Sequence, residues 1–201
     1  VFDAMRAAAA GRDNVRFIAR ERVVWMGMGL VNAEMRAIGD LMERDGGFDY
    51  LVSLSMQDYP LRSRKEIVAE LEAAPGLNYI RMLRLDEQPF NVRRRPYLMS
   101  FELENRLLKT QLPRPVPAST PIRFKGSWWR VLSREFCEWL VHSPVTGRYL
   151  DFLRHVQARR TAVPEPDHGK PLQGYARRRL PPSGPLAGRQ RQPGYGYNVA
   201  T

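Results

Sequence analysis

The sequence predicts an α/β fold in which a mostly parallel sheet is flanked by helices. Strand-like and helix-like segments alternate from Val15 to Leu71 in the order β-α-β-α, the pattern of a parallel sheet with helices on its faces. The apolar segment Phe48–Leu54 ends abruptly in small polar residues, followed by an Asp and a Pro. Open α/β sheets place ligands at such strand ends. A further strand candidate, Trp129–Leu132, leads directly into a helix.

The first elements follow from local patterns. Residues 2–10 are rich in alanine and predict a helix. Val15–Ile18 is a short strand candidate. Asn32 is expected to cap a helix, because apolar residues follow it at helical spacing, and the pair Gly46–Gly47 is expected to end that helix. The strand Tyr50–Leu54 comes next.

A capping box marks the start of the next helix. Ser63 is expected to cap it, while the side chain of Glu66 reaches back to the Ser63 backbone N–H. Residues 76–121 contain a strand candidate at Leu77–Ile80. They otherwise predict a long loop, because a run of arginines, Arg93–Arg95, and several prolines interrupt any periodic pattern.

The last helices precede a change of composition. Ser133 is expected to cap a helix through Val141, and another helix is expected from Thr146 to Arg160. Residues 161–201 hold seven prolines and six glycines, with six basic against two acidic residues. Such a segment buries too little apolar surface to offset its ordering entropy. We therefore expect one domain over residues 1–160 and a Pro/Gly/Arg-rich disordered tail over residues 161–201.

The chain is strongly basic, with a formal net charge of +11. A basic balance suits nucleic acid, an anionic membrane surface or a phosphorylated substrate. Only the charge itself and short runs such as Arg177–Arg179 favour nucleic acid, so no nucleic-acid partner is expected. The chain begins with Val1 inside a helical pattern, shows no signal peptide or membrane-spanning run, and is expected to be a fragment.

The single cysteine, Cys137, excludes an intrachain disulfide. Its neighbours Phe136, Trp139 and Leu140 are apolar and lie in the predicted helix that Ser133 caps. The surroundings favour a buried structural thiol over a nucleophile. The histidines His142 and His155 lack metal-ligand company, so no zinc site is expected.

Three segments carry a resemblance to a known family. Ser53–Leu61 reads Ser-Leu-Ser-Met-Gln-Asp-Tyr-Pro-Leu, and Gly126–Phe136 reads Gly-Ser-Trp-Trp-Arg-Val-Leu-Ser-Arg-Glu-Phe. Upstream, Val24–Gly27 is followed by Ala33–Glu34. In their order along the chain, the segments resemble motifs of the family 14 glycosyltransferases, the core-2/I-branching N-acetylglucosaminyltransferase and protein xylosyltransferase family. The resemblance covers about residues 13–160.

The resemblance implies a fold and an activity. The fold is an incomplete GT-A-like (Rossmann-like) one, because the first nucleotide-binding strands expected before Val15 are missing. The activity is inverting transfer of a sugar from a UDP-sugar to a glycan or protein hydroxyl, with a carboxylate as general base. Basic side chains, in place of a metal, stabilise the departing diphosphate in this family. No metal and no cofactor beyond the UDP-sugar donor are therefore expected, and no Asp-x-Asp occurs.

The family also implies a cellular place. If the protein is eukaryotic, the intact protein is expected to be a type II membrane protein of the Golgi, with this domain on the lumenal side and a membrane anchor outside the present chain. Its expected partners are a nucleotide sugar and a glycan or protein acceptor. A non-catalytic carbohydrate- or anion-binding module is the alternative function.

The first motif contributes one candidate substrate-binding residue. Asp58 either contacts the ligand or stabilises a turn by accepting hydrogen bonds from nearby backbone N–H groups. In the second motif, Gly126 and Ser127 either allow the backbone to approach the substrate closely or form a tight strand entry. Trp128 is a candidate for stacking on a sugar, and adjacent strand positions predict that it and Trp129 face opposite sides.

Three more candidates come from the surrounding segments. Trp25 lies in the upstream Trp-Gly pattern. Arg134 stands in the first turn of a helix, where the dipole does not favour a cation, which indicates a ligand or an ion pair. Arg94 lies where related enzymes have a basic segment on the acceptor side, or in a solvated basic loop.

The catalytic base is expected near the end of the resemblance. Glu165 follows a proline as the family's catalytic Glu does, shifted by one position and without the aromatic residues that normally follow. Three explanations stay open: a truncated or misframed gene product, a diverged family member with reassigned catalytic residues, or a catalytically inactive relative that acts as a binding module.

Overall fold

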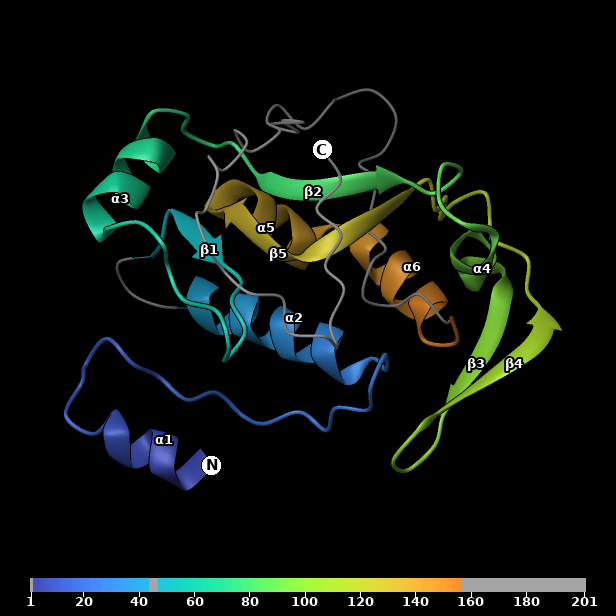
Figure 1. Ribbon diagram of the computed structural model, residues 1–201, viewed down its shortest axis with the longest axis horizontal. Helices are drawn as coiled ribbons and strands as arrows, with labels where there is room; N and C mark the ends of the chain where they lie inside the picture. The colour runs from blue at the N-terminus through green and yellow to red at the C-terminus, as the bar shows by residue number, and fades with distance from the viewer. Residues whose placement is uncertain (1, 44–46, 157–201) are drawn as a thin grey trace, which may run out of the picture.

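A computed structural model describes residues 2–43 and 47–156, which form two sheets and the helices around them (Figure 1). The elements, in chain order, are α1 (Phe2–Ala8), α2 (Gly29–Met42), β1 (Tyr50–Val52), α3 (Arg64–Glu72), β2 (Tyr79–Arg84), α4 (Phe90–Arg93), the 3-10 helix η1 (Arg95–Tyr97), β3 (Leu98–Glu102), β4 (Leu107–Pro113), β5 (Phe124–Ser133), α5 (Arg134–His142) and α6 (Pro144–Leu153). Strands β3 and β4 form a separate hairpin beside α4 (Figure 1).

The main sheet has the strand order β1-β5-β2, and β5 pairs antiparallel with both neighbours. The predicted mostly parallel sheet is therefore wrong for the described residues. Because β1 and β2 both run opposite to β5, they run parallel to each other, as the β-α-β pattern around α3 requires. They are not adjacent, however, because a strand from much later in the chain lies between them.

Two further expectations differ from the structure. Val15–Ile18 belongs to no helix or strand in the described part of the chain. Residues 76–121 are not one long loop, since they contain β2, α4, η1 and the β3–β4 hairpin. The strand expected at Leu77–Ile80 is confirmed as the start of β2. None of the prolines of this region lies in the middle of a described strand, since Pro89 caps α4, Pro96 lies in η1 and Pro113 ends β4.

Helix α2 is confirmed, but it begins at Gly29 rather than after Asn32. No side chain near its start caps it. Instead, the Met28 backbone N–H donates to the Oε2 atom of Glu102, at 3.0 Å. An acidic side chain at a helix N-terminus satisfies free N–H groups and complements the helix dipole. This cap comes from β3, far along the chain, so local sequence did not reveal it.

The capping box at the start of α3 is confirmed. The Ser63 Oγ atom accepts from the Glu66 backbone N–H, and the Glu66 carboxylate accepts from the Ser63 backbone N–H at 2.9 Å. We expect Ser63→Ala to lower the free energy of unfolding by about 1 kcal/mol, because the bond from the Glu66 backbone N–H loses its acceptor, the Ser63 hydroxyl. Urea denaturation measures the loss. Ser119→Ala, at an exposed turn serine, is the control and is expected to change little; equal effects would contradict the capping role.

Helices α2 and α5 cover one face of the main sheet. Their buried side chains join those of the central strands in a single apolar cluster: Ile38, Ile80, Leu132, Phe136, Cys137 and Leu140. The helix that Ser133 caps is confirmed as α5. The Ser133 backbone N–H donates to the side chain of Asn78, the residue before β2, and this bond fixes the capping residue. A smaller cluster of Phe152, Leu153 and Val156 lies at the end of α6.

Cys137 is buried in this core, as predicted. Burial, together with the nearby Glu34 carboxylate, raises the pKa of its thiol to about 11. A thiol with this pKa is almost entirely protonated at neutral pH. Its role is therefore packing.

The remaining expectations concern the C-terminal part. Helix α6 begins at Pro144, since Ser143 caps it, and ends at Leu153 rather than at Arg160. The predicted disordered tail, residues 161–201, lies outside the described residues. In the part that the structure describes, no helix combines the length and the apolar character needed to cross a bilayer.

Candidate functional site

The second motif forms an irregularity in strand β5. Ile80 of β2 stands opposite Arg130, whereas Met82 stands opposite Gly126. Between these pairs the single residue Arg81 faces three residues of β5, Ser127–Trp129. Such a β-bulge bends its strand and redirects side chains, and bulges are frequent next to active sites. The motif residues therefore sit at a place where the sheet is locally reshaped.

A cavity of about 460 Å³ opens beside this bulge. Sheet residues, the turn before α2 and the α4–η1 segment enclose it. Within the described part of the chain, its lining combines aromatic rings with three cationic side chains and contains no carboxylate. The lining residues are Met26, Arg81, Leu83, Leu85, Val92, Arg95, Pro96, Ile122, Phe124, Lys125, Gly126, Ser127, Trp128 and Trp129. Three of the predicted site residues, Gly126, Ser127 and Trp128, are thus brought together, and Trp128 and Trp129 both border the cavity because the bulge interrupts strict alternation.

Asp58 joins the first motif to the second. Its Oδ2 atom accepts from the Ser55 backbone N–H, which closes the turn after β1, and from the Trp129 indole Nε1–H at 2.7 Å. Asp58 therefore fills the turn role and also orients a tryptophan that borders the cavity. These hydrogen bonds, from Ser55 first and then from Trp129, lower the pKa of the Asp58 carboxyl below its ordinary value of 3.8.

The lowered pKa predicts a pH-dependent stabilisation. Because folding favours the charged carboxylate, the stabilisation is present above the ordinary pKa and disappears as pH falls through the lowered one. We expect Asp58→Ala to be less stable than wild type at neutral pH, with the gap closing below about pH 3.8. Denaturant unfolding of both proteins from about pH 7 to about pH 2.5 measures this. Trp129→Phe removes one of the donors to Asp58, so its loss of stability relative to wild type at neutral pH should be smaller. A loss in Asp58→Ala that does not change with pH would contradict the stabilising role of the charged carboxylate.

A charge pair under the sheet supports the bulged strand. The Arg130 Nε–H of β5 donates to the Glu34 Oε1 atom of α2 at 3.1 Å, and a second bond joins the same groups. The Ser53 hydroxyl, just after β1, also donates to Glu34. The Arg130 guanidinium lies 5.9 Å from the ring centre of Trp128. The pair thus ties α2 and β1 to the strand that carries the motif.

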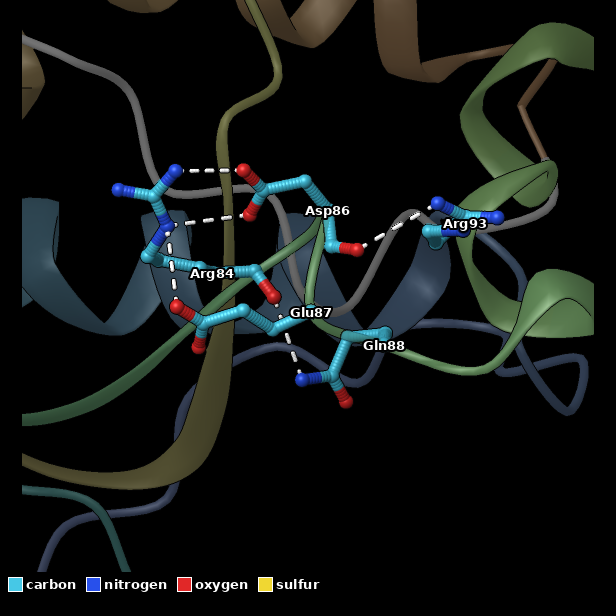
Figure 2. A network of polar contacts seen from close by, with 5 residues as sticks. All are labelled: Arg84, Asp86, Glu87, Gln88 and Arg93. Atoms are coloured by element: carbon cyan, nitrogen blue, oxygen red, sulfur yellow. Dashed lines mark hydrogen bonds and ion pairs between the residues drawn. The ribbon is translucent and has the colours of Figure 1, made fainter.

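A polar network holds the turn that carries the other wall of the cavity (Figure 2). The Arg84 guanidinium at the end of β2 faces the carboxylates of Asp86 and Glu87, and the Gln88 amide donates to the Arg84 carbonyl. From the following helix, Arg93 donates to the Asp86 carbonyl at 3.4 Å. These contacts direct the chain from β2 into α4 and η1, and so place Arg95 beside the cavity.

The remaining predicted site residues take other places. Trp25 is 74% exposed in the turn before α2, next to the cavity residue Met26. Arg94 bonds to Gln111 and lies over the Phe90 ring, so its neighbour Arg95 reaches the cavity instead.

Arg134 follows the far end of β5, eight residues after Gly126, which corresponds to about 26 Å along a strand. It forms an ion pair with Glu138 at 2.9 Å. Arg134, in the first turn of α5, therefore has its counter-ion in the same helix. Glu165 lies outside the described residues.

Sequence reasoning missed two sets of residues. Glu34 and Arg130 were not singled out as a pair, although Glu34 is part of the upstream motif and Arg130 of the second motif. Arg81, Arg95 and Lys125 were not linked, because they come from β2, η1 and β5. The unusual basic charge was the available signal, but only tertiary structure shows that these three line one cavity.

The sequence of the chain is similar to those of known proteins. The family model described as core-2/I-branching enzyme matches residues 1–164. Beta-1,3-galactosyl-O-glycosyl-glycoprotein beta-1,6-N-acetylglucosaminyltransferase 4 of Danio rerio is 27% identical over 125 residues, which are 61% of this chain and 29% of that protein. Xylosyltransferase 2 of Homo sapiens is 31% identical over 137 residues, 67% of this chain and 16% of that protein.

The chain spans less than a third of the length of these relatives. The family match over residues 1–164 includes both motifs that meet at the cavity, and these relatives are named as glycosyltransferases. The chain belongs to the core-2/I-branching enzyme family of glycosyltransferases.

Proposed function

We propose that this chain is part of an inverting glycosyltransferase that moves a sugar from a UDP-sugar to a hydroxyl of a glycan or protein. The observation that carries the proposal is the cavity at the β5 bulge, where Gly126, Ser127 and Trp128 of one motif lie together. Asp58 of the other motif is bonded to Trp129 on the same wall. Family membership supports sugar transfer as the reaction.

The cavity offers two kinds of group that sugar transfer needs. Aromatic rings bind the apolar face of a sugar, as Trp128 and Trp129 are placed to do. Cationic side chains stabilise negative charge that develops on a leaving diphosphate. We propose a reaction without a metal, as the resemblance implies, with Glu165 as the general base. Donor sugar and acceptor depend on contacts that the motifs do not encode.

The proposal includes the cellular setting of the intact protein. If the protein is eukaryotic, we propose a Golgi location with this domain on the lumenal side of the membrane, held by an anchor elsewhere in the intact protein. The proposed partners are a nucleotide sugar and a glycan or protein acceptor.

The alternative is a carbohydrate- or anion-binding module without turnover. A specific observation favours it: among the residues that the structure describes, none that lines the cavity has a carboxylate. The nearby carboxylate of Asp58 already accepts from Ser55 and Trp129, which makes it a poor proton acceptor. Binding without catalysis would use the same rings and cations.

Release of UDP, measured with a panel of UDP-sugars and acceptors, separates the two functions. A transferase should release UDP faster when an acceptor is present, and Trp128→Ala should slow that release at least about tenfold by removing a sugar contact. Leu108→Ala, on the exposed side of β4, is the control and should leave the rate unchanged. Sugar binding without acceptor-dependent UDP release would establish the binding module. Turnover that is unchanged in Asp58→Ala would remove Asp58 from the mechanism.

A further inference from the structure

The turn before α2 contains a strained residue. The Gly27 backbone N–H donates to the Val24 carbonyl at 2.7 Å, which closes a four-residue turn with Trp25 and Met26 at its central positions. Met26 has a φ of 64°, and it is the only residue other than glycine with a positive φ in the part of the chain that the structure describes. A positive φ at this position is typical of a type II turn, which favours glycine or asparagine there. Methionine is unfavourable in this conformation, because its Cβ atom comes close to the following carbonyl oxygen.

The surrounding structure holds Met26 in this conformation. Val24 and Gly27, on either side of the central positions, are both buried. The Glu102 carboxylate of β3 accepts from the Met28 backbone N–H at 3.0 Å. The same carboxylate lies so close to Gly27 that a Cβ atom there would stand 2.7 Å from the Glu102 Oε2 atom. Strained residues persist where such contacts fix the backbone, and they are concentrated at functional sites.

Met26 is a wall residue of the cavity beside the β5 bulge. It is half-buried and borders the cavity, as Trp128 and Trp129 do. Among the described residues that line the cavity, it is the only one that precedes β2 in the chain. A methionine side chain is long, unbranched and polarizable, so it adapts to irregular apolar surfaces. The turn before α2 therefore contributes an adaptable apolar contact to the site.

The turn itself does not require a methionine. Glycine would close the same turn without strain, and asparagine would close it with less strain than methionine. Turn formation therefore does not explain the residue at position 26, whereas a contact inside the cavity does. A residue that lowers stability and lines a binding site is typical of a trade-off between stability and function.

We propose that Met26 is a substrate-contacting residue, which the strained turn holds so that its side chain packs against the apolar part of a sugar in the cavity. The inference rests on the proposed function, since it adds a residue to the same site. Its contribution is apolar contact and not charge, so it is the same for a sugar of the donor and a sugar of the acceptor.

Two substitutions separate the backbone strain from the side chain. Met26→Gly and Met26→Ala both remove the thioether, but only glycine adopts a positive φ without strain. We expect Met26→Gly to unfold about 2–4 °C above Met26→Ala, because only the alanine variant retains the strained left-handed residue. Thermal unfolding measures the difference. Equal unfolding temperatures, or a more stable alanine variant, would show that the turn does not hold residue 26 in a left-handed conformation and would overturn the inference.

Binding of sugars to the 201-residue chain, followed by ligand-observed NMR, tests the contact. The probes are UDP-N-acetylglucosamine, UDP-xylose and methyl β-galactoside. For the probe that the wild type binds most tightly, we expect Met26→Ala and Met26→Gly to weaken binding equally, by about tenfold. Met26→Leu keeps an apolar side chain of similar volume and should weaken binding by less than about threefold. The control is Met5→Ala, on α1 and outside the cavity lining, which should bind like wild type.

Each outcome has a distinct meaning. Equal losses of affinity in the glycine and alanine variants, despite their different stabilities, support a direct contact. If affinity follows stability instead, so that Met26→Gly binds like wild type, residue 26 acts only through the fold and the inference is overturned, while a sugar site stays in place. Binding by Met26→Leu as weak as that by Met26→Ala also overturns the apolar contact. If the wild type binds none of the three probes, the proposed function of this chain fails and the inference fails with it.

Discussion

Replacing Arg130 by methionine is expected to lower the free energy of unfolding by about 3–5 kcal/mol. The Arg130 and Glu34 side chains are only 15% and 9% exposed. Two hydrogen bonds join the two side chains, and the Ser53 hydroxyl donates a further one to the Glu34 carboxylate. Methionine preserves much of the volume but leaves the Glu34 carboxylate poorly solvated and without its counter-ion. Urea denaturation, with circular dichroism as the readout, measures the loss.

A second variant distinguishes the lost charge from lost packing. The pair replacement Glu34→Leu/Arg130→Met removes both charges, and we expect it to recover most of the stability, because apolar residues often replace a buried ion pair without loss. The control is Arg134→Met, which breaks the more exposed pair with Glu138 and should cost about 1 kcal/mol or less. If Arg130→Met lowers the free energy of unfolding by no more than Arg134→Met does, the Arg130–Glu34 pair is not effectively shielded from water.

The same pair is expected to affect the site as well as the fold. Because the Arg130 guanidinium lies over Trp128, its replacement should change the near-ultraviolet circular dichroism of that indole. The change should be absent when Arg130→Met is introduced into a Trp128→Phe background. An identical change in both backgrounds would place its origin in another tryptophan.

Replacing Gly29 by alanine is expected to be the most damaging single-methyl change in α2. A Cβ atom at this position would lie 2.0 Å from the Arg22 carbonyl oxygen and 3.0 Å from the Val23 Cα atom. Both neighbours are backbone, so they yield only if the chain before α2 moves. We expect a loss of about 3 kcal/mol or more in the free energy of unfolding, at the upper end of what overpacking costs.

A second glycine of α2 provides a control, because its replacement by alanine is expected to raise the free energy of unfolding. A Cβ atom at Gly39 would meet nothing within 4 Å, and its backbone is helical. Gly39→Ala should therefore stabilise the protein by about 0.5–1 kcal/mol through the helix propensity of alanine. Thermal unfolding of the two variants measures both effects. Similar effects at the two positions would mean that the close approach of Arg22 to Gly29 does not exist in solution.

Local sequence was sufficient wherever a structure depends on neighbours along the chain. The capping box of α3 depends on residues three positions apart, and it was predicted correctly, as was the serine cap of α5. The strand at Trp129–Leu132 was predicted from its apolar pattern. The buried thiol of Cys137 followed from the helical spacing of the apolar residues around it.

Predictions failed where the partner is distant in sequence. The start of α2 was misplaced because its capping carboxylate, Glu102, comes from β3. The prediction of a mostly parallel sheet was wrong because the antiparallel strand β5 lies between β1 and β2. The alternation of apolar and polar residues along a strand does not reveal which strand pairs with it. The long loop of residues 76–121 was wrong because its short strands pair with each other or with β5.

For the candidate site, the sequence by itself determined the family. Asp58, Gly126, Ser127 and Trp128 were predicted as site residues from the two motifs that resemble that family. Only the tertiary structure decided how they meet: the bulge in β5, the bond from Trp129 to Asp58 and the gathering of Arg81, Arg95 and Lys125 around one cavity. The physical reason is that motifs record local chemistry, whereas a cavity and its electrostatic field arise from side chains that only strand pairing and helix packing bring together.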